Sequence, residues 1–208
     1  MNMNALKNIL LGISKELDVD PDVLWAIVSI ESTGAFEIGG GKIPILLERH
    51  KVYKFYKEKH GRDRARILYK EHPDICNPNS GGYGRYRDQY KRLAKAIRFA
   101  GGEIAHLSTS FGAFQIMGFN YVDCGFDSAS EMSDAFHANP EKEQIKGFLT
   151  FCKNYRKGEL LQAMKEKNFH RVAYLYNGSG YKKNKYAQRM YTAAGEWRRT
   201  YEGYEMAA

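Results

Sequence analysis

Apolar residues recur along most of the chain at the spacing of an α-helix, and one such series ends on a charged residue. The stretch PDVLWAIVSIESTG starts at Pro21. Within it, Leu24, Ile27 and Val28 share one helical face, and Glu31, seven positions after Leu24, belongs to that same face. Burial favours the neutral form of a carboxyl group, and a protonated carboxyl is what general-acid chemistry needs. The structural alternative is an ion pair with an arginine or a cap on a neighbouring helix.

Helical spacing also dominates the rest of the chain, whereas strand signals are scarce. It is found in NALKNILLGISKEL, LERHKVYKFYKEKH, QYKRLAKAIRFA and FHRVAYLYNG. The segment SASEMSDAF opens with a capping box formed by Ser128 and Glu131. A Gly-rich turn and a short apolar run in GGGKIPILLERH predict a small β element. The pattern therefore predicts a mainly α fold and excludes the βαβ and all-β classes.

The stretch STSFGAFQIMGFN places one amide among large apolar side chains. Its Ser110 is a predicted helix N-cap, and the small residues Gly112 and Ala113 allow a ligand to approach the backbone closely. Gln115 carries both a donor and an acceptor, which suits the hydroxyl and acetamido groups of a sugar. The alternative is a short core helix in which the Gln115 amide bonds to the backbone.

A second polar stretch, AYLYNGSGY, ends a predicted helix with aromatic and amide groups beside Gly178. Aromatic side chains stack on the apolar faces of sugar rings, and an amide fixes the orientation of the bound ring. The alternative is an ordinary Asn-Gly turn. Taken singly, neither this stretch nor the preceding one indicates a function.

Composition and charge narrow the class of the protein but leave its partner open. The chain has 208 residues, which suits one large domain or two small ones, and its 43% apolar and 27% charged residues are typical of a globular protein. The formal charge of +8 favours an anionic partner, such as nucleic acid, an anionic membrane surface or the bacterial envelope. Nine Lys or Arg residues lie between Arg49 and Lys70, where they form either a solvated face or a contact with an anionic polymer.

Several kinds of chemistry and anchoring are not indicated. The cysteines Cys76, Cys124 and Cys152 lack the spacing of a metal site and are expected to be reduced thiols. The sequence has no Gly-rich phosphate loop, His-Glu-x-x-His motif or nucleophile elbow, so we expect no metal and no cofactor.

The amphipathic N-terminal segment is not a signal peptide, and no segment is long and apolar enough to span a membrane. The amphipathic C-terminal run either packs on the domain or brings Trp197, Arg198 and Arg199 to anionic lipid.

Taken together, these motifs resemble a known family. The order ES.G, S.G..Q.M and YNG in an α-rich chain is similar to the lysozyme-like superfamily, with its goose-type lysozymes and soluble lytic transglycosylases. The fuller set ILLERHKVY, GGYGRY, TSFGAFQIMGFN, FLTF and YNGSGY resembles the phage N-acetylmuramidase endolysins from about Val23 to about Ala194. The resemblance implies a lysozyme-like helical fold with a small β element beside the active-site cleft. Some members of the family carry a separate wall-binding module, but a chain of this length has no room for one, so we expect residues 1–208 to form a single catalytic domain.

The activity implied by the resemblance is that of an endolysin, a glycoside hydrolase of host cell lysis. Its reaction is hydrolysis of the β-1,4 bond between N-acetylmuramic acid and N-acetylglucosamine in bacterial peptidoglycan. The catalytic acid of the family corresponds to Glu31, which would explain why a carboxyl group occupies an apolar helix face. A lytic transglycosylase, which shares these motifs and uses the 6-hydroxyl of the sugar to leave a 1,6-anhydro-muramyl product, is the alternative.

Hydrolysis with inversion needs a second carboxylate about 6.5–9.5 Å from the acid, whereas retention needs one nearer 5 Å. Glu48 is our candidate, because it lies in the family-like segment LLERH. The sequence also offers Glu37, Glu103 and Asp123. The structural alternative for Glu48 is a pair with a neighbouring basic residue or with a helix N-terminus.

The motif matches also assign residues that bind the glycan. These residues are Ser110, Gln115, Tyr176, Asn177 and Tyr181, together with Tyr83 of GGYGRY as a residue lining the cleft. The expected partner is the glycan strand of peptidoglycan, and the basic residues are expected to contact an anionic envelope surface. Nucleic acid is not an expected partner, and a monomer is expected.

A phage lysin without an export signal would be made in the host cytoplasm and act on the wall, in the periplasm, after release through a holin.

The competing class of function is a non-catalytic basic protein that binds nucleic acid or cell wall. It would account for the charge and for the fifteen tyrosines, which could stack on bases. It would not account for a glutamate on an apolar stripe that is followed by the Gln115 and Tyr-Asn motifs.

Overall fold

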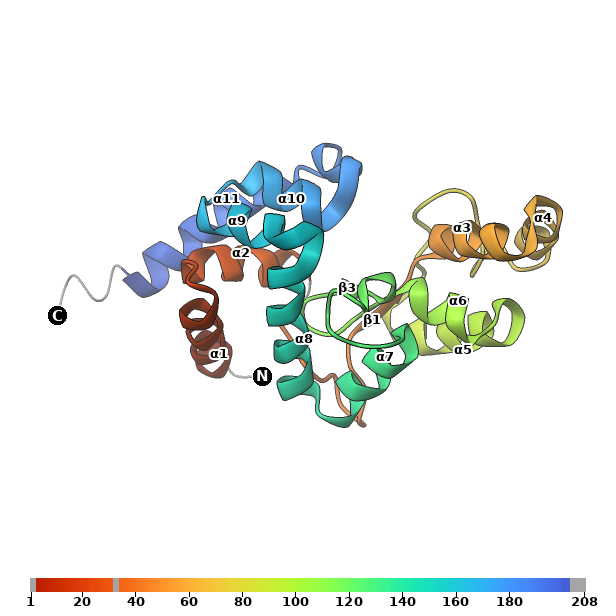
Figure 1. Cartoon of the computed structure of the whole chain (residues 1–208), viewed down its shortest axis with the longest axis horizontal. Helices are drawn as coiled ribbons and strands as arrows, with labels where there is room; N and C mark the ends of the chain where they lie inside the picture. Colours follow the sequence, from red (N-terminus) through yellow and green to blue (C-terminus); the bar gives the residue numbers. More distant parts are fainter. Residues whose placement is uncertain (1–2, 32–33, 203–208) are drawn as a thin grey trace. The chain divides into compact units, whose positions relative to one another are not determined.

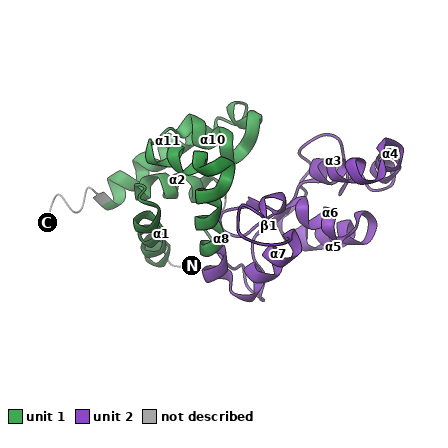
Figure 2. Cartoon of the chain, viewed as in Figure 1, with its two compact units in different colours: residues 1–35, 145–208 green, residues 36–144 purple. Residues whose placement is uncertain are grey.

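In the computed structural model, residues 3–31 and 34–202 are described, and the chain divides into two compact units (Figure 1). Unit 1 combines residues 1–35 with residues 145–208, and unit 2 comprises residues 36–144 (Figure 2). The two ends of the chain thus belong to the same unit, and the middle of the chain forms the other.

Among the described residues of unit 1, the regular secondary structure is helical. Its elements are α1 (Met3–Leu17), α2 (Pro21–Glu31), the greater part of α8 (Pro140–Asn154), η3 (Tyr155–Gly158), α9 (Glu159–Lys165), α10 (Phe169–Asn177), η4 (Gly178–Lys182), α11 (Tyr186–Trp197) and a π-helical turn, η5 (Arg198–Glu202). Most of these boundaries follow the apolar periodicity that the sequence shows.

The apolar face of α2 lies in the core of unit 1. Leu24 and Ile27 are fully buried, and Val28 is 1% exposed. Helix α11 packs against α2, with the rings of Trp25 and Trp197 centred 5.8 Å apart. Trp197 is 2% exposed, so the alternative in which this side chain reaches a lipid surface is wrong.

Unit 2 surrounds a small sheet with short helices. The strands are β1 (Ile45–Leu47), β2 (Thr109–Phe111) and β3 (Ile116–Met117), and the helical elements are α3 (Arg49–His60), α4 (Arg62–Glu71), η1 (Tyr86–Asp88), α5 (Gln89–Ala100), α6 (Gly102–Leu107), η2 (Gly118–Asn120), α7 (Ala129–Ala138) and the first turn of α8. The predicted capping box is present in α7, where the Ser128 hydroxyl accepts a hydrogen bond from the Glu131 amide at 3.0 Å.

The sheet is antiparallel in the order β1-β2-β3, and its register gives it one buried and one open face. Side chains alternate between the faces of a strand. The row Ile45–Phe111–Ile116 is buried, at 1%, 0% and 2% exposure, and belongs to the core face. The neighbouring row is Leu46–Ser110–Met117, in which Leu46 and Met117 are half-buried and Ser110 is 4% exposed. We call the side of the sheet that carries this row its open face.

The sheet confirms the predicted mainly α fold with a small β element and corrects one detail. The stretch STSFGAFQIMGFN forms the β2–β3 hairpin, so Ser110 is a strand residue and the N-cap prediction is wrong. Gly112 occupies the turn with a φ of +76°, and a Cβ atom there would collide with the Gln144 side chain. Glycine is therefore the residue that this turn tolerates.

The three cysteines are free and buried, as expected for reduced thiols. Burial raises the pKa of the Cys76 thiol to about 12 and raises that of Cys124 as well, so both stay protonated near neutral pH. Within the described ranges, no helix combines the length and the hydropathy that crossing a membrane would need.

Candidate active site

Glu31 is the last residue of α2, directly after the buried apolar face. Its backbone completes the helix, whereas its side chain lies outside the described part of the chain. The face that was predicted to carry it is confirmed as buried by Leu24, Ile27 and Val28. The burial of the Glu31 carboxyl group and its role as an acid stay predictions.

The opposite end of α2 carries a buried carboxylate that the sequence analysis missed. Asp22 is fully buried, and its Oδ2 accepts hydrogen bonds from Arg198 Nη1 at 2.6 Å and from Lys167 Nζ at 3.3 Å. Burial by itself would lower the pKa of Lys167. The contacts with Asp20 and Asp22 together have the larger effect, so the pKa of Lys167 is raised. This cluster ties the start of α2 to η5 and to the loop before α10. No periodic signal could have revealed it, because its members are 145 and 176 positions apart.

Tyr176 and Asn177 form the last turn of α10, as the YNG motif suggested. The Tyr176 ring meets the Phe151 ring edge to face, with centroids 6.1 Å apart. The Asn177 Nδ2 atom is shielded from solvent and has no hydrogen-bond partner among the described residues. A buried donor without an acceptor is costly, so this amide marks a position where a polar partner would be accommodated.

Tyr181 lies in η4, immediately after α10. It helps to line an open pocket of about 500 Å³, together with His170, Arg171, Tyr174 and Lys182 among others. The Tyr181 ring packs edge to face against the rings of His170 and Tyr174, each with centroids 6.2 Å away. The aromatic and cationic side chains of this pocket suit a ring or an anion.

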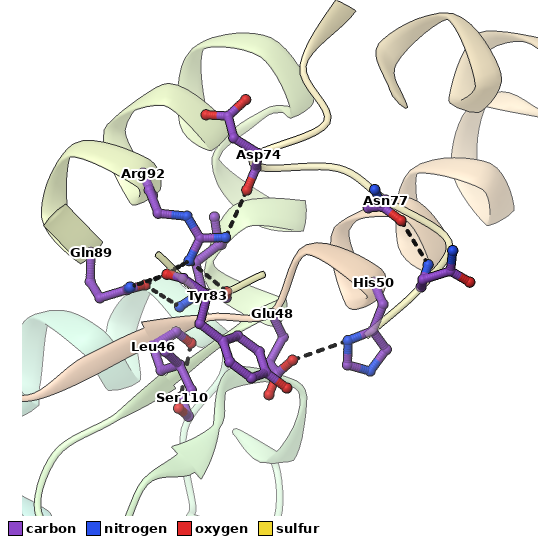
Figure 3. A network of polar contacts seen from close by, with 11 residues as sticks. Leu46, Glu48, His50, Asp74, Asn77, Tyr83, Gln89, Arg92 and Ser110 are labelled. Carbon is purple, nitrogen blue, oxygen red and sulfur yellow. Dashed lines mark hydrogen bonds and ion pairs between the residues drawn. The ribbon is translucent and has the colours of Figure 1, made fainter. Parts of the chain in front are cut away.

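Glu48 lies between β1 and α3, on the open side of the sheet. It takes the N-cap position of α3, but its carboxylate makes no capping hydrogen bond. Its side chain is 17% exposed, and Oε2 lies 3.0 Å from His50 Nδ1 (Figure 3). The carboxylate therefore does not cap α3 but contacts His50 in its first turn, so the alternative of a pair with a neighbouring basic residue is present.

Tyr83 reaches the same carboxylate from the Gly-rich loop, so the structure brings two predicted site residues together. Burial raises the pKa of Tyr83, and the charge of Glu48 and the hydrogen bond between the two side chains raise it further. The loop passes over the Arg49 guanidinium at Gly82, where φ is +65° and a Cβ atom would collide with that group. This close passage explains why the GGYGRY motif needs a glycine before Tyr83.

A buried polar network holds this loop and the end of β1, and sequence reasoning missed it (Figure 3). Arg92 is 8% exposed and donates to the carbonyls of Leu47, Tyr83 and Asp74 at 3.2, 2.7 and 2.7 Å. Gln89 is 1% exposed, accepts from the Leu47 amide at 3.1 Å and donates to the Tyr83 carbonyl at 2.6 Å. Both residues therefore set the positions of the backbone segments from which Glu48 and Tyr83 project.

Ser110 and Gln115 are joined within the β2–β3 hairpin. The Ser110 hydroxyl donates to Gln115 Oε1 at 2.9 Å, and Gln115 Nε2 donates to the Gly112 carbonyl at 2.8 Å. Gln115 has a φ of +48°, which these hydrogen bonds help to hold. The alternative for Gln115, an amide bonded to backbone, is present, and its sugar contact stays a prediction.

The other candidate carboxylates differ from Glu48 in their surroundings. Glu37 is exposed and accepts from the Gly41 amide at 3.2 Å, and Glu103 is 67% exposed and pairs with Lys59 at 2.5 Å. Burial raises the pKa of Asp123, which is half-buried. None of these three is placed on the open face of the sheet by the strand register. Among the described residues, no cluster of histidine, cysteine or carboxylate side chains is arranged to hold a metal ion.

Comparison with known proteins decides the family to which this arrangement belongs. The Muramidase family, described as N-acetylmuramidase, matches residues 20–198. This chain belongs to the N-acetylmuramidase family. The match includes α2, the sheet, the Glu48–Tyr83 network and the YNG motif, so the family resemblance inferred from the sequence is confirmed.

A solved structure supports the same assignment for this muramidase. The chain is 31% identical to the protein in the "Crystal structure of Burkholderia AP3 phage endolysin", with a TM-score of 0.74. The alignment covers 93% of this chain and 71% of that chain. No curated protein sequence matches. The muramidase is thus a glycoside hydrolase with a lysozyme-like, mainly α fold, and the predicted function as a peptidoglycan-hydrolysing endolysin is confirmed at this level.

Proposed function

We propose that this muramidase hydrolyses the β-1,4 bond between N-acetylmuramic acid and N-acetylglucosamine, with Glu31 as the general acid and Glu48 as the second carboxylate. The observation that carries the proposal for Glu48 is its environment. It is a largely buried carboxylate on the open side of the sheet, it does not cap the helix that it precedes, and two polar side chains hold it. A group placed in this way is available to a substrate rather than used by the fold.

In this mechanism, Glu31 gives its proton to the glycosidic oxygen as the bond from that oxygen to the sugar C1 breaks. The positive charge that develops on the muramic acid ring is stabilised by a nearby carboxylate. Glu48 accepts a proton from the attacking water, whose oxygen forms the new bond to C1. The product then carries a reducing end, and the acid and base are restored by exchange with solvent.

The remaining predicted residues would bind the glycan. Tyr83 would contact the sugar next to Glu48, and Tyr176 and Tyr181 would stack on sugar rings. Asn177 would donate its unpaired amide hydrogen to an acetamido or hydroxyl oxygen. We assign Ser110 and Gln115 mainly to shaping the sheet surface, since their polar atoms are bonded to each other.

Product analysis tests the reaction. Purified peptidoglycan is digested, and the soluble fragments are examined by mass spectrometry. Muropeptides that end in reducing N-acetylmuramic acid support hydrolysis at the proposed bond. Fragments that are lighter by one water, with 1,6-anhydro-muramyl ends, would establish the transglycosylase alternative, and reducing N-acetylglucosamine ends would place the cut at the other glycosidic bond.

We also propose how the protein meets its substrate. The two units act as one catalytic domain of a monomer, and the basic surface of α3 and α4 contacts an anionic envelope polymer. Exposed cations on these helices include Lys54, Lys57, Arg62, Arg64 and Arg66. Binding that weakens as salt is raised would support this role, because screening acts on exposed charges. Binding to purified wall that is insensitive to salt would contradict it.

For the route to the wall, we propose synthesis in the host cytoplasm, release through a holin and action on the wall in the periplasm. The assignment to phage endolysins supports this route. The test is expression with and without a holin, followed by measurement of culture turbidity. Lysis that requires the holin supports the proposal, and lysis at the same rate without it would contradict it.

A further inference from the structure

The pairing between His50 and Glu48 has features that the mechanism above does not use. His50 lies in the first turn of α3, two residues after Glu48, and its side chain is 28% exposed. His50 Nδ1 and Glu48 Oε2 are 3.0 Å apart. Both atoms are shielded from solvent, and neither has a hydrogen-bond partner among the described residues. Their contact is thus an ion pair without the geometry of a hydrogen bond (Figure 3).

The other charged groups around Glu48 are engaged elsewhere or act at longer range. Arg92 donates its hydrogen bonds to backbone carbonyls and to Gln89. Arg49 Nη1 donates to the Pro73 carbonyl at 3.3 Å. Burial lowers the pKa of Lys51, the nearby Lys54 lowers it further, and the charge of Glu48 opposes both effects. Within the described ranges, His50 is the one residue in ion-pair contact with Glu48.

We propose that His50 is a positioning residue that holds the Glu48 carboxylate in its reactive orientation. This inference rests on the proposed role of Glu48. The His50 ring lies in ion-pair contact with Oε2 at 3.0 Å, and the Tyr83 side chain hydrogen-bonds to the same carboxylate. Rotation of the carboxylate is therefore restricted from two sides.

Two variants test the contact. His50→Ala removes the ring, whereas His50→Asn keeps a neutral polar group near the position of Nδ1. We expect His50→Ala to lower kcat by roughly 10- to 100-fold, because a reacting group misplaced by about 1 Å costs that much. His50→Asn should recover part of kcat. KM should change little in both variants, since His50 is not proposed to touch the glycan.

The matched control is His60→Ala, at the other end of α3, where the His60 ring packs on Tyr56 with centroids 4.4 Å apart. It should leave kcat unchanged. Solubilisation of purified peptidoglycan is measured over a range of substrate concentrations to separate kcat from KM, and thermal unfolding is followed by circular dichroism. A His50→Ala variant with the wild-type kcat, or one in which KM rises while kcat is kept, would overturn the proposal, even if stability had fallen.

A third variant distinguishes the failure of this inference from the failure of the proposed function. Glu48→Gln should lower kcat in a wild-type background. If Glu48→Gln keeps the wild-type rate, the role of Glu48 in the proposed function is wrong, whatever His50 does. If Glu48→Gln is impaired but His50→Ala retains the wild-type kcat, Glu48 keeps its role and the His50 proposal alone is overturned.

Discussion

The candidate residues of unit 1 lie at helix ends, whereas those of unit 2 lie on a sheet face within a polar network. Glu31 is the last residue of α2, and Asn177 is the last residue of α10. The packing of these two helices therefore positions the backbone of each residue. Glu48 follows a three-residue strand, and Tyr83 lies in a loop without regular structure. Their backbones are held instead by the side chain of Arg92, together with Gln89.

This difference shows two ways of placing a reactive side chain. A helix satisfies its own backbone hydrogen bonds, so apolar packing is sufficient to position its last turn. A short strand followed by a loop leaves backbone groups that need partners, and buried polar side chains supply them in unit 2. The loss of a polar residue should consequently harm the site of unit 2 more than that of unit 1, and the following substitutions test this contrast.

The largest effect is expected when the acid of unit 1 is removed. Glu31→Gln should lower kcat by roughly 10²- to 10⁴-fold, the usual contribution of general acid–base catalysis, with little change in thermal stability. Glu48→Gln should cause a smaller loss, because an amide keeps the shape and one acceptor of the carboxylate. Initial rates of fragment release from purified peptidoglycan measure both. A Glu31→Gln variant with the wild-type kcat would end the assignment of the acid.

The next effect concerns the buried guanidinium of unit 2. Arg92→Met should destabilise the protein by about 2–4 kcal/mol, because it leaves buried carbonyl acceptors without donors. It should also lower kcat, since the Leu47 and Tyr83 backbones lose their common partner. Urea denaturation measures the free energy of unfolding. A variant with normal stability but low activity, or the reverse, would show that the network does not couple fold and site in the way proposed.

The corresponding substitution in unit 1 is Asp22→Asn. We expect a loss of about 1–3 kcal/mol, the range for a hydrogen bond to charged groups. The loss should be the smaller of the two because Arg198 and Lys167 are 45% and 38% exposed and regain water when the carboxylate is gone. The same denaturation experiment gives the comparison. A loss larger than that of Arg92→Met would reverse the contrast between the units.

A backbone substitution tests the hairpin that carries Ser110. Gly112→Ala should destabilise the protein by about 1–3 kcal/mol, because φ is +76° and the new methyl group meets the Gln144 side chain. Gly102→Ala is the matched control, since that glycine begins α6 with open space around it. The control should be neutral or slightly stabilising. Equal thermal midpoints for the two variants would contradict the role of the turn.

The smallest effect is expected from the Tyr83 hydroxyl. Burial first, and then the charge of Glu48, raises the pKa of Tyr83, so the folded protein holds this proton more tightly than the unfolded chain does. The stabilising contribution is complete below the ordinary tyrosine pKa of about 10 and is lost as the pH rises through the folded value. Between pH 9 and pH 11, the free energy of unfolding of the wild type should therefore fall more steeply than that of Tyr83→Phe. Identical slopes in urea denaturation would contradict this prediction.

Much of the fold was predictable from local pattern. Leu24, Ile27 and Val28 recur at helical spacing, and they are buried in α2 as predicted. Ser128 caps α7 as its capping box indicated. The hairpin at Ser110 was not predicted, because its strands have three and two residues and are stabilised by pairing with β1, 64 positions earlier in the chain. Such short strands carry too few residues for a periodic signal.

By itself, the sequence determined the helical class, the order of the motifs and the identity of the candidate acid Glu31, because helical periodicity and motif spacing are local properties of the chain. Only the tertiary structure decided that the Glu48 carboxylate leaves α3 uncapped and meets His50 and Tyr83, and that Arg92 holds the segments from which Glu48 and Tyr83 project. The reason is physical. A buried polar group takes whichever partner folding brings within hydrogen-bond distance, and no spacing along the chain specifies that partner.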